Sequence, residues 1–124
     1  LVDIVLGGVN TLESITETEE LMPVVIDLGL KRRNELTEQT LMQLGADIKY
    51  MIGRMFQGAP INAMFKGTRS ELAAFGKAMF REKKYMDSYL RYGLDDPRTY
   101  RDSFRLKTAV KNFEKATGLR WPFK

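Results

Sequence analysis

Apolar residues recur at spacings of three and four over much of this chain, and that period is typical of amphipathic helices. The clearest run predicts a helix over residues 34–56, with an inner face of Leu41, Leu44, Ile48, Met51, Ile52, Met55 and Phe56. The tripeptide Gly58-Ala59-Pro60 should end it. The central part of the chain is therefore expected to be helical.

Capping signals place two more helix starts. Thr68-Arg69-Ser70-Glu71 is a capping box and predicts a helix over residues 69–91, with Gly93 just past its end. Asp96 before Pro97 predicts a second start, with a short helix over residues 97–102. A last helix should carry Leu106, Val110 and Phe113 inward and stop at Gly118.

The first third of the chain gives a weaker pattern. Residues 1–15 are expected to be extended or loosely ordered, and a helix should begin between Thr16 and Glu20. Its inner face would be Leu21, Val24, Val25 and Leu28. In the connection 57–67, the apolar residues Ile61, Met64 and Phe65 should form a loop or a single helical turn.

Together these patterns predict an all-α fold, with residues 1–124 as a single domain of four or five helices around one core. The core should bury Leu44, Ile48, Leu72, Phe75, Met79, Val110 and Phe113. Most of the seven methionines fall on these apolar faces, where they would fill the core or form an adaptable groove for a partner helix.

The composition disfavours an enzyme. The chain has no cysteine and no histidine, so it lacks thiolate nucleophiles, the commonest metal ligand and the side chain that titrates nearest neutral pH. We expect no catalytic residue, no metal and no cofactor. No apolar run approaches the roughly 20 residues that span a bilayer, so we expect a cytoplasmic protein of a cell or an infected host, without membrane contact.

Charge is divided unevenly. Residues 1–62 carry a net −4, whereas residues 63–124 carry a net +8. Nine basic residues, interleaved with Tyr85, Tyr92, Tyr100 and Trp121, are candidates for contact with nucleic-acid phosphates: Lys77, Arg81, Lys84, Arg91, Arg98, Arg101, Arg105, Lys107 and Lys111. Alternatively they form the solvated side of two helices, with Glu82, Asp87 and Glu114 as local partners.

Two further groups are candidates for binding a protein partner. Glu13, Glu17, Glu19 and Glu20 would cap a first helical turn or contact a basic partner, including a second copy of the chain. Trp121 and Phe123 would anchor the C-terminal end by burial, or form an exposed peptide that docks into a partner.

The sequence from Tyr92 to Lys124 and the length of the chain resemble those of small accessory proteins of large tailed bacteriophages. The resemblance implies an auxiliary or assembly protein and assigns no site residue.

Two functions remain open, both non-catalytic. The chain is either a protein-interaction or assembly factor, with a protein partner or a second copy, or a nucleic-acid-binding domain of little sequence specificity. We favour the first from sequence, because a helix-turn-helix needs two helices joined by a tight turn and the expected loops fit that poorly. A continuous positive face across both basic helices would instead favour nucleic acid.

Overall fold

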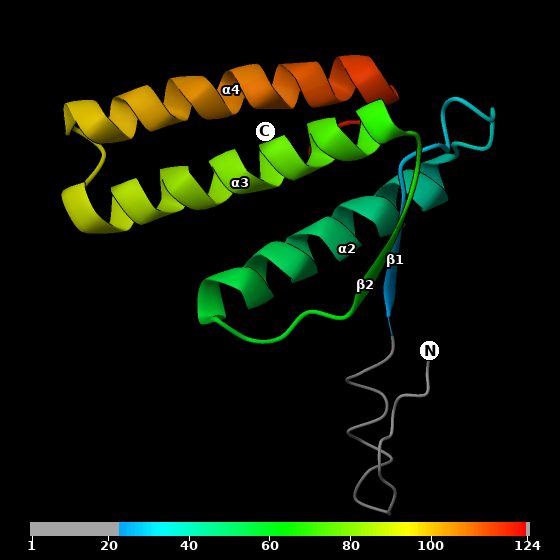
Figure 1. Ribbon diagram of the computed structural model, residues 1–124, viewed down its shortest axis with the longest axis horizontal. Coiled ribbons are helices and arrows are strands. Elements are labelled where there is room, and N and C mark those ends of the chain that lie inside the picture. The colour runs from blue at the N-terminus through cyan, green and yellow to red at the C-terminus, as the bar shows by residue number, and fades with distance from the viewer. Residues whose placement is uncertain (1–22, 124) are drawn as a thin grey trace, which may run out of the picture.

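The computed structural model describes residues 23–123, and the elements follow in the order β1 (Val24–Asp27), α2 (Glu38–Gln57), β2 (Ala63–Lys66), α3 (Arg69–Tyr92) and α4 (Pro97–Thr117) (Figure 1). This part is mostly helical, as expected, but it holds three helices and a short parallel sheet rather than four or five helices. The extended segment expected over residues 1–15 and the helix start expected at 16–20 lie outside the described residues.

The helix expected across Val24, Val25 and Leu28 is wrong, because residues 24–27 form strand β1. Ile26 is fully buried while Val25 is 44% exposed, which is the alternation of a strand with one covered face. Three successive β-branched residues favour this conformation. The segment expected as a loop or helical turn near Phe65 is strand β2, paired in parallel with β1 so that Ile26 lies opposite Phe65.

Helix α2 connects the two strands and begins four residues later than expected. Asn34 has a φ of 62°, a left-handed conformation that cannot lie inside a helix. Thr37 is the N-cap instead, and its side chain accepts from the backbone N–H of Thr40 while the Thr40 side chain accepts from the backbone N–H of Thr37. The expected end at Gly58 is confirmed, with a left-handed φ of 69°.

The caps of α3 and α4 are confirmed. Thr68 and Glu71 form the expected capping box, and Asp96 accepts from the backbone N–H of Arg98. The expected break after residue 102 is wrong, because α4 runs unbroken to Thr117. Asp102 does not cap a new helix, since its carboxylate instead accepts a hydrogen bond from Ser88 of α3.

The core is confirmed at six of the seven expected positions. Leu44, Ile48, Phe75, Met79, Val110 and Phe113 are buried together. Leu72 is the exception at 36% exposed, because Glu71 rather than Leu72 faces inward in the first turn of α3. Trp121 is 2% exposed and belongs to the core, whereas Phe123 is 44% exposed.

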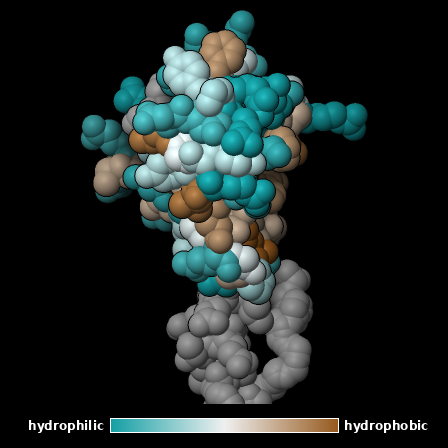
Figure 2. Space-filling view, turned by 90° about the vertical axis from the view of Figure 1, so that its left-hand side faces the viewer, coloured by the Kyte–Doolittle hydropathy of each residue, from teal (hydrophilic) through white to brown (hydrophobic). Residues whose placement is uncertain are grey.

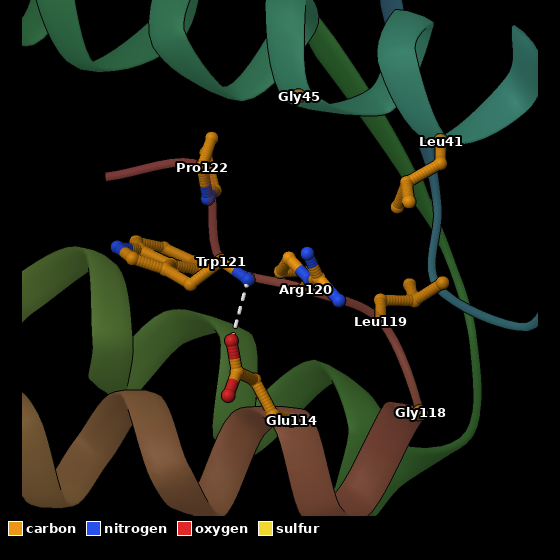
Figure 3. A pocket seen from close by; sticks show the side chains of 8 residues that line it. All are labelled: Leu41, Gly45, Glu114, Gly118, Leu119, Arg120, Trp121 and Pro122. Atoms are coloured by element: carbon orange, nitrogen blue, oxygen red, sulfur yellow. Dashed lines mark hydrogen bonds between the residues drawn. The ribbon is translucent and has the colours of Figure 1, made fainter. Parts of the chain in front are cut away.

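Helices α3 and α4 lie antiparallel as a hairpin, and α2 diverges from it (Figure 1). The C-terminal tail, residues 118–123, passes between α2 and α4 (Figure 3). No helix in residues 23–123 is both long and apolar enough to cross a membrane.

Candidate functional site

The α3–α4 hairpin carries all nine basic candidate residues on two helices that are fixed to each other. At the distal end of the hairpin, Thr99 donates a hydrogen bond to the Ser88 carbonyl at 3.1 Å, and the Ser88 hydroxyl donates to Asp102. Thr99, Asp102 and Ser88 are all buried. These buried bonds set the register of the two helices, so the backbone positions that carry the solvent-facing residues are fixed relative to each other.

Seven of the nine basic residues share the side of the hairpin that faces away from α2. Helical periodicity places them away from the inward-facing Glu82 of α3 and Val110 of α4, with Arg81 at the flank of the set. We call this set the outer basic face: Lys77, Arg81, Lys84, Arg91, Arg98, Arg101 and Arg105. All are exposed except Arg81, which is half-buried and lies over the Phe80 ring at 5.3 Å.

Acidic side chains do not neutralise this face. Within the described part of the chain, Arg98 is the one member in an ion pair, with Asp96 at 3.0 Å. The acids expected as local partners are engaged elsewhere. Glu82 is buried, and Asp87 pairs with Lys83. Local ion pairs therefore neutralise little of the charge of this face.

The remaining two basic residues, Lys107 and Lys111, lie on another side of α4. They line a cavity together with Ser103, Val110 and the tail, and helical periodicity places them roughly a quarter to a third of a turn around α4 from Arg101. On the same side of α4 as these lysines, Tyr100 and Phe104 are 77% and 69% exposed. The sequence suggested one basic stripe, but α4 instead carries basic residues around its whole solvent-exposed side.

The basic cluster Lys31-Arg32-Arg33 is not a free electrostatic patch. Arg32 forms two hydrogen bonds with Glu71, at 3.0 and 3.1 Å, and Arg33 pairs with Asp27 at 2.6 Å. The Arg32 guanidinium lowers the pKa of the Glu71 carboxyl, and the Arg33 guanidinium lowers that of Asp27. These pairs connect the turn after β1 to α3 and hold the structure together.

The candidate partner-binding residues differ from one another in their exposure. Trp121 is not an exposed docking residue, because it is buried and its indole N–H donates to Glu82 Oε1 at 3.0 Å. Phe123 is accessible at the edge of the cavity. The acidic candidates Glu13, Glu17, Glu19 and Glu20 lie outside the described residues. Glu82 itself was missed as a site residue, because a glutamate between Arg81 and Lys83 gives no signal of burial.

No family model, no curated protein and no solved structure matches this chain. In residues 23–123, no three acidic side chains gather in a way that could hold a metal ion.

Proposed function

We propose that this domain is a non-catalytic nucleic-acid-binding domain that contacts phosphates through the outer basic face with little sequence specificity. The observation that carries the proposal is the lack of acidic partners: six of the seven basic residues of this face form no ion pair with any described residue. Leaving like charges together costs free energy through mutual repulsion, and an anionic partner removes that cost.

The phosphate backbone is the partner whose chemistry fits such a face. Lys and Arg side chains that neutralise phosphates release condensed counterions, which supplies most of the free energy of non-specific binding. The hairpin presents its cations in two parallel rows, on α3 and on α4. Contact with about four phosphates would give a log–log salt slope of roughly −3 to −4.

A charge-reversal experiment tests the proposal. The triple variant Lys77→Glu, Arg81→Glu, Lys84→Glu changes only side chains on the solvent side of α3, so the fold should survive. The matched control reverses three exposed residues elsewhere, Lys49, Lys66 and Arg69. Both variants change the net charge from +4 to −2, so any difference between them reports position rather than total charge.

Fluorescence anisotropy with labelled single- and double-stranded DNA at two salt concentrations gives the result. We expect the outer-face variant to lose roughly 100-fold or more in affinity, while the control loses much less. Wild-type binding weaker than about 10⁻⁴ M and insensitive to salt would contradict the proposal.

The second candidate function is protein interaction or assembly, which the exposed apolar side chains favour. Leu90, Leu94 and Met42 are 72%, 60% and 74% exposed, and Val25 and Met64 lie together on the open face of the sheet. Apolar patches lie between polar ones at the distal end of the hairpin (Figure 2). A small auxiliary protein, as the bacteriophage resemblance implies, would use such patches for a partner. Sedimentation of the purified chain with and without nucleic acid separates this candidate from the first.

A further inference from the structure

A cavity of about 510 Å³ opens on the inner side of the hairpin, between α3, α4 and the C-terminal tail. Its walls include three aromatic residues, Tyr85, Trp121 and Phe123, and the aliphatic Leu106. This volume is typical of sites for small ligands, and aromatic walls suit a flat ring. The cavity belongs to the same two helices as the outer basic face but opens on another side.

One buried polar atom in this cavity has no partner. Glu82 is 5% exposed, and its Oε1 accepts the indole N–H of Trp121 at 3.0 Å. No group in residues 23–123 donates a hydrogen bond to Oε2. A buried acceptor without a donor costs free energy, so a ligand with an N–H group would remove that cost. Burial also raises the pKa of the Glu82 carboxyl.

Two lysines at the edge of the cavity could bind a phosphate group. Lys107 and Lys111 line it, are exposed, and have no ion pair among the described residues. Tyr100 and Phe104 lie along the same side of α4, one and two helical turns before them. Exposed aromatic side chains beside lysines are typical of surfaces that bind single-stranded nucleic acid.

We propose that this cavity binds the amino-bearing base of a nucleotide, that is adenine, cytosine or guanine, with the base among the aromatic walls and an N–H donated to Glu82 Oε2. The phosphate contacts Lys107 and Lys111. This inference rests on the proposed nucleic-acid function and deepens it, because it assigns single strands or free nucleotides as the ligand at a second position of the hairpin.

The unpaired carboxylate oxygen also sets a base preference. Cytosine presents its N4 amino group as a donor, which a carboxylate accepts well. Thymine and uracil present one N–H between two carbonyl oxygens, and these oxygens repel a carboxylate. A hydrogen bond to a charged group is worth about 1.5–3 kcal/mol, which corresponds to a preference of about tenfold or more for cytosine.

Trp121 provides a direct signal, because it is the single tryptophan of the chain and lines the cavity. We would titrate oligocytidine and oligothymidine of equal length, and separately cytidine and thymidine monophosphates, while recording tryptophan fluorescence and anisotropy. The expected result is a fluorescence change with cytidine that thymidine produces at about tenfold higher concentration. The monophosphates distinguish a free nucleotide from a base within a strand.

Two variants connect the signal to the cavity. Glu82→Gln keeps an oxygen for Trp121 but places an amide N–H at the other position, so the preference for cytosine should disappear or turn toward thymine. Phe123→Ala removes an exposed aromatic wall and should weaken binding about fivefold or more, since a stacked base is worth about 1–3 kcal/mol. The control Asp87→Asn removes a carboxylate from α3 outside the cavity and should change neither property.

The outcomes separate the two proposals. Equal, salt-dependent binding of both oligonucleotides without a tryptophan signal would overturn the cavity proposal and leave the outer basic face intact. Binding of the monophosphates without binding of either oligonucleotide would support the cavity and overturn the proposed function. Absence of any binding would overturn both.

Discussion

Two buried carboxylates on α3 differ in what surrounds them, and their pKa values move in opposite directions. Glu71 accepts two hydrogen bonds from Arg32 and one from the Thr68 backbone N–H, so its pKa is lowered and its charge is stabilised. Glu82 has the Trp121 indole as its one hydrogen-bond donor in the described region, and burial raises its pKa. Folding thus favours the charged form of Glu71 and disfavours that of Glu82.

A stability measurement against pH tests this assignment for Glu82. Its folded pKa lies above the ordinary value of 4.5, so the folded state binds more protons in the window between the two values. Stability therefore falls as pH rises through that window. We expect Glu82→Gln, measured by urea unfolding from about pH 4 to 8, to match the wild type at low pH, to gain stability relative to it through the window, and to keep that advantage above the window.

Glu71 is the control, because its effect on stability should change with pH in the opposite direction. Its pKa is lowered, so its contribution is present above 4.5 and is lost as pH falls through the folded value. Glu71→Gln should therefore be least harmful at low pH and most harmful at neutral pH. A Glu82→Gln variant that is less stable than the wild type at neutral pH would show that the Glu82 charge is compensated within the protein.

Among the elements, α3 is held at its first turn by contacts from two directions. Thr68 Oγ1 accepts from the Glu71 backbone N–H at 3.2 Å, and Glu71 Oε1 accepts from the Thr68 backbone N–H at 2.8 Å. Arg32, from the turn after β1, holds the same carboxylate. Glu71 thus joins the turn after β1 to the hairpin and also completes the N-terminal cap of α3.

Replacing the capping threonine should weaken this junction. Thr68→Ala removes one acceptor for the orphan N–H groups of α3, so we expect a loss of about 0.5–2 kcal/mol in the free energy of unfolding. Thr108→Ala is the matched control, because Thr108 is exposed within α4 and bonds only the Phe104 carbonyl. That control should be close to neutral. Equal losses for both variants would mean that the cap adds nothing specific.

The elements also show what could be predicted from the sequence. The caps at Thr68, Asp96 and Gly58 were predictable because each depends on a few adjacent residues. Strand β1 was not, because Val24 and Val25 fit a helical face as well as a strand, and the choice depends on pairing with β2 about 40 residues later. Leu72 was misplaced because Glu71 takes the inner position four residues before Phe75, and the burial of a glutamate paired with the distant Arg32 has no local signal.

For the whole molecule, the candidate site also combines features that the sequence alone shows with features that depend on distant contacts. The sequence named all seven residues of the outer basic face and both lysines at the cavity, since charge is visible without a fold. It could not show that Lys107 and Lys111 lie at a cavity and not on the outer basic face, because the tail that closes this cavity is placed by tertiary contacts. For the same reason, the burial of Glu82 could not be foreseen from its neighbours.

The C-terminal tail completes the core between α2 and the hairpin. Trp121 packs against Phe113 and Phe75 with ring centroids 5.1 and 6.2 Å apart, and its backbone N–H donates to Glu114 at 2.8 Å. On the α2 side, Gly45 lies opposite Pro122, and Leu41 lies opposite Leu119 (Figure 3). The tail thus packs between α2 and the hairpin and supplies Trp121 to the core there.

Truncating Trp121 should therefore destabilise the whole molecule rather than loosen one end. Trp121→Ala leaves a void beside Phe113 and also deprives Glu82 of its donor, so we expect a loss of about 3–5 kcal/mol in the free energy of unfolding. Circular dichroism during urea unfolding is the measurement, since the variant has no tryptophan. Phe123→Ala is the control from the same tail and, being partly exposed, should cost much less. A loss below about 1 kcal/mol for Trp121→Ala would mean that the helices hold together without the tail.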